Sequence, residues 1–131
     1  MSSAVRYFSR SGNTRALAEA VARGAGVPAV SIDAEEAAIG GHVDVLLIGG
    51  ALYAYGIDKR LKAYIGTLKK ENVGKAVVFS SAAISRHALD LLRQELAARG
   101  IPVESEMLFA RSRPGEKQLR EAEEFGKKFG K

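Results

Sequence analysis

The feature that most constrains the fold is a regular alternation of short apolar runs with longer segments whose apolar residues recur at helical spacing. Residues 4–8, 43–48 and 76–79 form three of these runs, and we expect each to be a β-strand. The runs at 43–48 and 76–79 are continuously apolar apart from Asp44, as expected for strands covered on both faces. Strands that alternate with helices predict an α/β fold, a doubly wound parallel sheet with helices on both faces.

Two further strands are expected in this sheet. Residues 27–32 contain Pro28, whose missing N–H is tolerated at a sheet edge. Residues 101–110 contain Glu104 and Glu106, which alternate with other side chains as an edge strand permits. The sequence therefore predicts five strands.

Helical segments connect the expected strands. The first covers residues 13–24, where four apolar residues recur at helical spacing. We expect Asp58 and Ser85 to cap two later helices. Gly100 should follow the second of these helices, and Pro114 should lie in the first turn of the last helix.

The length of 131 residues, without a visible linker or repeat, predicts a single domain over residues 1–131. No apolar stretch approaches the roughly 18 residues of a membrane helix, and the start lacks the apolar core of a signal peptide. The chain has no cysteine, which excludes disulfides and cysteine metal ligands, and its two histidines are too scattered for a metal cluster. We therefore expect a cytoplasmic protein without a metal.

The formal net charge of +5 is compatible with a nucleic-acid partner. The basic residues form no single block, however. Apart from a small group at residues 111–113, they are mixed with glutamates along the expected helices. A solvated surface explains this pattern better, so the sequence argues against nucleic-acid binding.

Three loops are expected at one end of the sheet, since parallel strands all end on the same side. They follow the first, third and fourth strands, at residues 9–13, 49–57 and 80–85. The first offers hydroxyls and a glycine, the second glycines and two tyrosines, and the third small side chains. Together they suggest a slot for a ligand with an anionic end and a flat, apolar end.

The segment Ser-Arg-Ser-Gly-Asn-Thr at residues 9–14 has two interpretations. A helix that begins near Asn13 leaves backbone N–H groups free, and with the hydroxyls of Ser9, Ser11 and Thr14 they form a cup suited to a phosphate. In the alternative, Ser11 or Asn13 only caps the helix. The additional Ser9 and the position directly after the first strand favour the phosphate cup.

These segments resemble the flavodoxin family. Residues 7–22, YFSRSGNTRALAEAVA, look like its phosphate loop and the helix that follows. Residues 49–65, GGALYAYGIDKRLKAYI, look like its flavin-side loop and helix, and residues 111–129 are similar to its C-terminal part. The resemblance implies a five-stranded sheet of order 2-1-3-4-5 that binds one flavin mononucleotide (FMN). No insertion splits the last strand, which is typical of the short-chain form.

Carried over to this sequence, the resemblance also implies which residues hold FMN. The phosphate would be held by Ser9, Arg10, Ser11, Gly12, Asn13 and Thr14. One side of the isoalloxazine ring would be lined by Ala51, Leu52 and Tyr53, and the other by Ser81, Ala82, Ala83 and Ile84. The sequence differs from typical flavodoxins in having no aromatic residue in the third loop and in being basic rather than acidic.

The charge around the expected slot bears on the redox chemistry. Arg10, Lys59, Arg60 and Arg86 lie in or beside the three loops, with Asp58 as the one acid. Positive charges should favour the fully reduced flavin, which is usually anionic in flavodoxins. Coulomb's law gives roughly 2 kcal/mol for a pair about 8 Å apart at an effective dielectric near 20, before solvent screening. We therefore expect the second reduction potential to be higher than in acidic flavodoxins.

The resemblance implies an electron carrier that shuttles electrons between redox partner proteins and has no catalytic residues of its own. Because the chain is basic, we expect an acidic patch on its partner. Two alternatives stay open: a reductase that uses NADH or NADPH to reduce a quinone or flavin, and an interaction module that has lost the cofactor. The lack of a separate nicotinamide-binding motif favours the carrier.

Overall fold

A computed structural model describes residues 2–51, 53, 56–82, 86–111 and 113–130 of the chain. Five parallel strands form one sheet of order β2-β1-β3-β4-β5, which confirms the predicted order. The strands are β1 (Ser3–Tyr7), β2 (Ala29–Ser31), β3 (Val43–Ala51), β4 (Val73–Ala82) and β5 (Leu108–Arg111).

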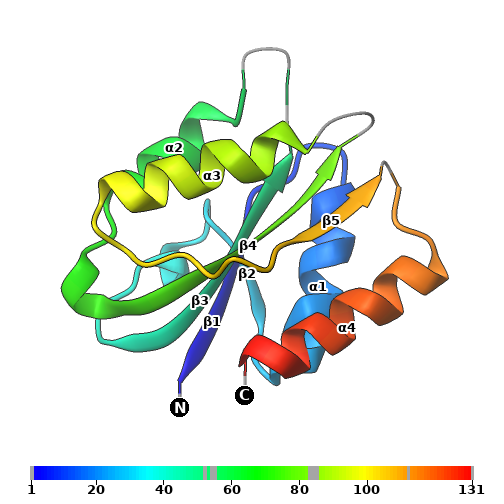
Figure 1. The fold of residues 1–131 in the computed structure, drawn as a ribbon, viewed down its shortest axis with the longest axis horizontal. Helices are drawn as coiled ribbons and strands as arrows, with labels where there is room; N and C mark the ends of the chain where they lie inside the picture. Colours follow the sequence, from blue (N-terminus) through cyan, green and yellow to red (C-terminus); the bar gives the residue numbers. More distant parts are fainter. Residues whose placement is uncertain (1, 52, 54–55, 83–85, 112, 131) are drawn as a thin grey trace.

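Four helices cover the two faces of the sheet (Figure 1). Helices α1 (Asn13–Ala25) and α4 (Glu116–Gly130) lie on one face, and α2 (Lys59–Gly66) and α3 (His87–Ala98) lie on the other. Short 3-10 turns, η1 (Glu35–Ala37) and η2 (Lys70–Asn72), complete the connections. None of the helices described is both long and apolar enough to cross a membrane.

Each face has its own apolar core, because successive side chains of a strand point to opposite sides. Leu46 and Val78 pack in the cluster beneath α2 and α3. Their neighbours Leu47 and Val77 pack in the cluster beneath α1 and α4. The two continuously apolar runs of the sequence thus supply both cores, as predicted for strands buried on both faces.

The two central strands are longer than the sequence predicted. Residues 49–51 and 80–82 belong to β3 and β4, although we expected them in loops. Gly49 and Gly50 pair with β4 as regular strand residues. A Cβ on Gly49 would lie 2.1 Å from the Phe79 ring, and a Cβ on Gly50 would lie 2.4 Å from Leu61. These glycines therefore make room for core side chains rather than forming a loop.

Several predicted boundaries change at the sheet edges and helix ends. β2 and β5 are shorter than predicted, and Val103 makes only an isolated bridge to Ala76 before β5 begins. Pro114 lies before α4, so its predicted place in the first turn is wrong. The carbonyl of Gly115 accepts the helical hydrogen bond from the Leu119 amide, and the helix therefore begins after Gly115.

Two of the predicted helix signals are confirmed and a third is untested. Asp58 caps α2, since its side chain accepts a hydrogen bond from the amide of Arg60. Gly100 follows the end of α3 with a φ of 77°, a conformation that glycine adopts without strain. Ser85 lies outside the described residues, and Arg86 occupies the N-cap position of α3.

Helices α1 and α4 are in backbone contact. A Cβ on Gly24 would lie 1.9 Å from the carbonyl oxygen of Glu123, and a Cβ on Gly126 would lie 2.0 Å from the carbonyl oxygen of Val21. Only glycine permits this approach, because backbone atoms cannot move aside as a flexible side chain can. The contact holds α1 firmly against the C-terminal helix.

Replacing Gly126 by alanine should force the two helices apart. We expect the free energy of unfolding to fall by roughly 1–3 kcal/mol, the usual cost of overpacking, measured by urea denaturation. Gly66→Ala at the end of α2 is the matched control, because nothing lies within 4 Å of the new methyl group. Equal unfolding free energies for the two variants would contradict the close contact between α1 and α4.

Candidate functional site

The three neighbouring strands β1, β3 and β4 end side by side at one end of the sheet, where their carboxyl termini lie (Figure 1). In the parallel register, Tyr7 of β1 is level with Gly49 of β3, and Ala51 of β3 is level with Ser81 of β4. The ends of β1, β3 and β4 are thus brought together, as the sequence predicted. We call residues 8–12, 52–58 and 83–86, which follow these strands, the first, second and third segments.

The first segment leads into α1 through Gly12. This residue is the N-cap of α1, has a φ of 91°, and makes no side-chain capping bond. The Gly12 amide donates to Ser9 Oγ at 3.0 Å, and the Asn13 amide donates to Ser11 Oγ at 3.4 Å. Gly12 rather than Ser11 or Asn13 is the N-cap, although the Ser11 hydroxyl accepts a hydrogen bond from the first amide of α1.

The next two amides of α1 are available to a ligand. Within the described part of the chain, no acceptor is found for the N–H groups of Thr14 and Arg15. The first turn of α1 contains no acidic residue, so the positive end of the helix dipole is not offset there. The start of α1 can therefore receive an anion.

A buried hydrogen bond connects α1 to β4. The hydroxyls of Thr14 and Ser81 are 2.7 Å apart, and the two residues are 1% and 2% exposed. The structure thus places the predicted phosphate ligand Thr14 and the predicted ring contact Ser81 against each other. In this pair, the hydroxyl that accepts the hydrogen bond still has its own proton, which it can donate to a further acceptor.

The second segment is anchored at Tyr53. Its amide donates to the Gly56 carbonyl at 2.7 Å, and the Gly56 amide donates back to Tyr53 at 3.0 Å. Ala51 is the last residue of β3 and is half-buried. Leu52, predicted beside them, lies outside the described residues.

The third segment is described only in part. Ala82 is the last residue of β4, and the predicted ring contacts Ala83 and Ile84 lie outside the described residues. The assignment of these residues to a ring-binding wall therefore stays a prediction. Ser80, which the sequence analysis did not assign, is fully buried, and no partner is found for its Oγ within the described residues.

The side chain of Arg10 connects the first segment to the second. Its guanidinium donates to Asp58 Oδ2 at 2.6 Å and lies 4.2 Å from the centre of the Tyr53 ring. The amide and Nε of Arg60 donate to Asp58 Oδ1 at 2.8 and 3.3 Å, and its guanidinium lies 4.4 Å from the centre of the Phe8 ring. Asp58 is therefore the shared counter-charge of two arginines.

From the sequence, Asp58 was expected to cap a helix and to be the one acid beside the three loops, but it was not paired with Arg10 or Arg60. The signal that could have shown its second role is a charge pattern: one acid between the three loops, with Arg60 two residues later and Arg10 in the first loop. No local pattern in the sequence predicts that Arg10 contacts Asp58 and Tyr53, because the first and second segments are far apart in the sequence.

Asp58 is ionised at neutral pH despite its burial. Burial opposes ionisation, but hydrogen bonds from the Arg60 amide and from the Arg10 and Arg60 guanidinium groups outweigh it and lower the pKa of Asp58 below 3.8. Because the pKa is lower in the folded protein than in the unfolded chain, this carboxylate stabilises the fold above the unfolded pKa. The contribution is lost as the pH falls through the folded-state pKa.

The variant Asp58→Asn tests this linkage, since asparagine also caps helices but carries no charge. Between about pH 6 and about pH 2, the unfolding free energy of the variant should fall less steeply than that of the wild type. Urea denaturation at a series of pH values measures both. Parallel curves for the two proteins would contradict a lowered pKa of Asp58.

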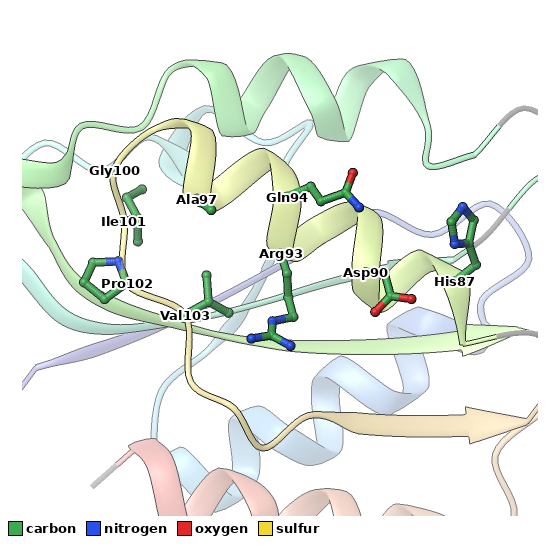
Figure 2. Close-up of a pocket in the computed structure, with 9 residues that line it drawn as sticks. All are labelled: His87, Asp90, Arg93, Gln94, Ala97, Gly100, Ile101, Pro102 and Val103. Carbon is green, nitrogen blue, oxygen red and sulfur yellow. The ribbon is translucent and has the colours of Figure 1, made fainter.

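A separate groove of about 670 Å³ lies along α3 (Figure 2). Asp90, Arg93 and Gln94 of α3 line it, and residues 100–103 form the opposite wall. His87, the first residue of α3, lies at the end that follows the third segment. None of the predicted site residues that the structure describes lines this groove.

Comparisons with known proteins bear on the fold. No protein-family model and no curated protein sequence matches the chain. A flavodoxin from the domain Archaea matches with a TM-score of 0.78 and 24% identity, over 99% of this chain and 96% of that chain. Oxidised flavodoxin 1 from Bacillus cereus matches with a TM-score of 0.77 and 25% identity, over 95% of both chains.

A larger protein also matches. The metal-soaked flavodiiron core from Synechocystis sp. PCC6803 has a TM-score of 0.78 and 24% identity, over 99% of this chain but only 35% of that chain. The sheet order and helix layers define a doubly wound α/β protein. More specifically, the chain has the flavodoxin fold in its short-chain form, as the sequence resemblance predicted.

Proposed function

We propose that the protein binds FMN and carries electrons between redox partner proteins. The flavodoxin fold supports this proposal, since two of the three sequence motifs that resemble the family include the segments that follow β1 and β3. One observation carries it: the amides of Thr14 and Arg15, in the first turn of α1, have no acceptor among the described residues and follow directly on the hydroxyls of the first segment. A phosphate is the group that such donors recognise best.

The donor set of the first segment fits a phosphate. The amides of Thr14 and Arg15 can donate directly, and the dipole of α1 adds positive potential. The hydroxyls of Ser9 and Ser11 accept hydrogen bonds from the amides of Gly12 and Asn13. When a phosphate accepts from these amides instead, the hydroxyls can rotate and donate to the phosphate as well. No atom lies within 4 Å of a Cβ position at Gly12, so a ligand can approach the backbone there.

The second segment offers a surface for the flat ring. Tyr53 is half-buried and held by backbone hydrogen bonds, and a tyrosine can stack on an electron-poor ring. When bound, FMN supplies the electron transfer. The chain binds the phosphate, orients the ring and shields one of its faces from water.

Redox partners with an acidic patch are complementary to the positive side chains around the candidate site. The side chains of Arg10 and Arg60 are 45% and 59% exposed, and Lys59, which lies between Asp58 and Arg60 in the sequence, is also exposed. Cations on an exposed rim attract an acidic surface and raise the rate of association, an effect that salt weakens.

Added FMN should bind to the purified protein and change its visible spectrum. We expect FMN to bind at least about tenfold more tightly than riboflavin, which lacks the phosphate, because charge-assisted hydrogen bonds contribute about 1.5–3 kcal/mol. The double variant Ser9→Ala/Ser11→Ala should lose part of this preference while its affinity for riboflavin stays the same. Ser105→Ala, an exposed position outside the three segments, is the control.

A colourless protein that takes up no FMN would contradict the proposal. It would favour the third reading of the sequence, an interaction module with a flavodoxin fold. Equal affinities for FMN and riboflavin would mean that the start of α1 does not hold the phosphate.

A second candidate function is the reduction of a quinone or flavin by NADH or NADPH. The groove along α3 favours it, because this concave and partly polar surface begins directly after the third segment. For an electron carrier, we expect the FMN-loaded protein to oxidise NADH and NADPH no faster than free FMN does. Absorbance at the reduced nicotinamide band measures this, and a rate well above that of free FMN would favour the reductase.

A further inference from the structure

Arg10 has a structural position that its place in the phosphate loop did not predict. We infer that Arg10 is a positioning residue that backs Tyr53 with a fixed positive charge and thereby favours binding of reduced flavin over oxidised flavin. The inference rests on the proposed FMN binding and adds to it the residue that tunes the reduction potential.

The position of Arg10 is set by a rigid partner. The side chain of Asp58 is only 4% exposed and is the N-cap of α2, held by the Arg60 amide at 2.8 Å. Arg10 donates a charge-assisted hydrogen bond to it at 2.6 Å. The guanidinium therefore lies on the α2 side of the site.

The backbone of Tyr53 is held by its two hydrogen bonds with Gly56 at 2.7 and 3.0 Å. The Arg10 guanidinium lies 4.2 Å from the centre of its ring, within the range of a cation–π contact. Because Arg10 covers one face of Tyr53, a flat ligand that stacks on this tyrosine uses the opposite face. The Arg10 guanidinium, the Tyr53 ring and the ligand are then stacked in this order.

The local charges do not cancel. Asp58 contributes one negative charge, whereas Arg10 and Arg60 that contact it contribute two positive charges. Lys59, the first residue of α2, adds a third. The surplus is positive, and it interacts more favourably with a ligand that gains negative charge on reduction than with the neutral oxidised ring.

The test compares three variants of the FMN-loaded protein. Arg10→Gln removes the charge but keeps hydrogen-bond donors, Arg10→Lys keeps the charge, and Arg23→Gln is the control. Arg23 lies in the last turn of α1, at the end opposite the proposed cup, and its side chain is 59% exposed. Replacing it by glutamine changes the net charge by the same amount as Arg10→Gln does. Fluorescence titration gives the affinity for oxidised FMN, and a redox titration gives the two reduction potentials.

Arg10→Gln should lower the second potential, which corresponds to roughly five- to tenfold weaker binding of fully reduced FMN relative to one-electron-reduced FMN after solvent screening. Arg10→Lys should restore most of the wild-type potential, and Arg23→Gln should leave it unchanged. A purely structural role of Arg10 would weaken the oxidised and reduced forms equally and leave the potential unmoved.

Two results would overturn the inference while leaving FMN binding established. One is a second potential in Arg10→Gln equal to that in Arg23→Gln. The other is tighter binding of oxidised FMN by Arg10→Gln, which would show that Arg10 occupies the place of the ring instead of backing it. A wild-type protein that binds no FMN would instead contradict the proposed function itself.

Discussion

The candidate site depends on the parallel register of three adjacent strands. β1 pairs with β3, and β3 pairs with β4, so that Tyr7, Gly49 and Phe79 are level across the sheet. Because all three strands run in the same direction, segments that are far apart in the sequence leave the sheet at one edge. Backbone pairing alone therefore brings together the phosphate-type donors, the aromatic ring and the cations.

Two side-chain contacts then fix these segments relative to one another. The buried Thr14–Ser81 hydrogen bond joins α1 to β4. The Arg10–Asp58 ion pair joins the first segment to the start of α2. A ligand that spans the segments meets donors that are already ordered, and it loses less free energy to ordering than it would on mobile loops.

Much of the fold could be predicted because local pattern and global topology agree. Continuous apolar runs indicated β3 and β4, and helical spacing indicated α1. The ends of the central strands were mispredicted, since Gly49 is typical of a loop in sequence but here makes room for a core side chain. Contacts such as Arg10 with Asp58 could not be predicted, because they depend on a register between segments that no local pattern encodes.

The glycine contact between α1 and α4 links the site to the order in which the chain is made. α1 belongs to the first part of the sequence to be synthesised, yet the face of α1 that carries Gly24 rests on the helix that carries Gly126. Until α4 has left the ribosome, that face stays exposed to water and α1 lacks its main support. The proposed phosphate site at the start of α1 therefore depends on α4 as well as on α1 itself.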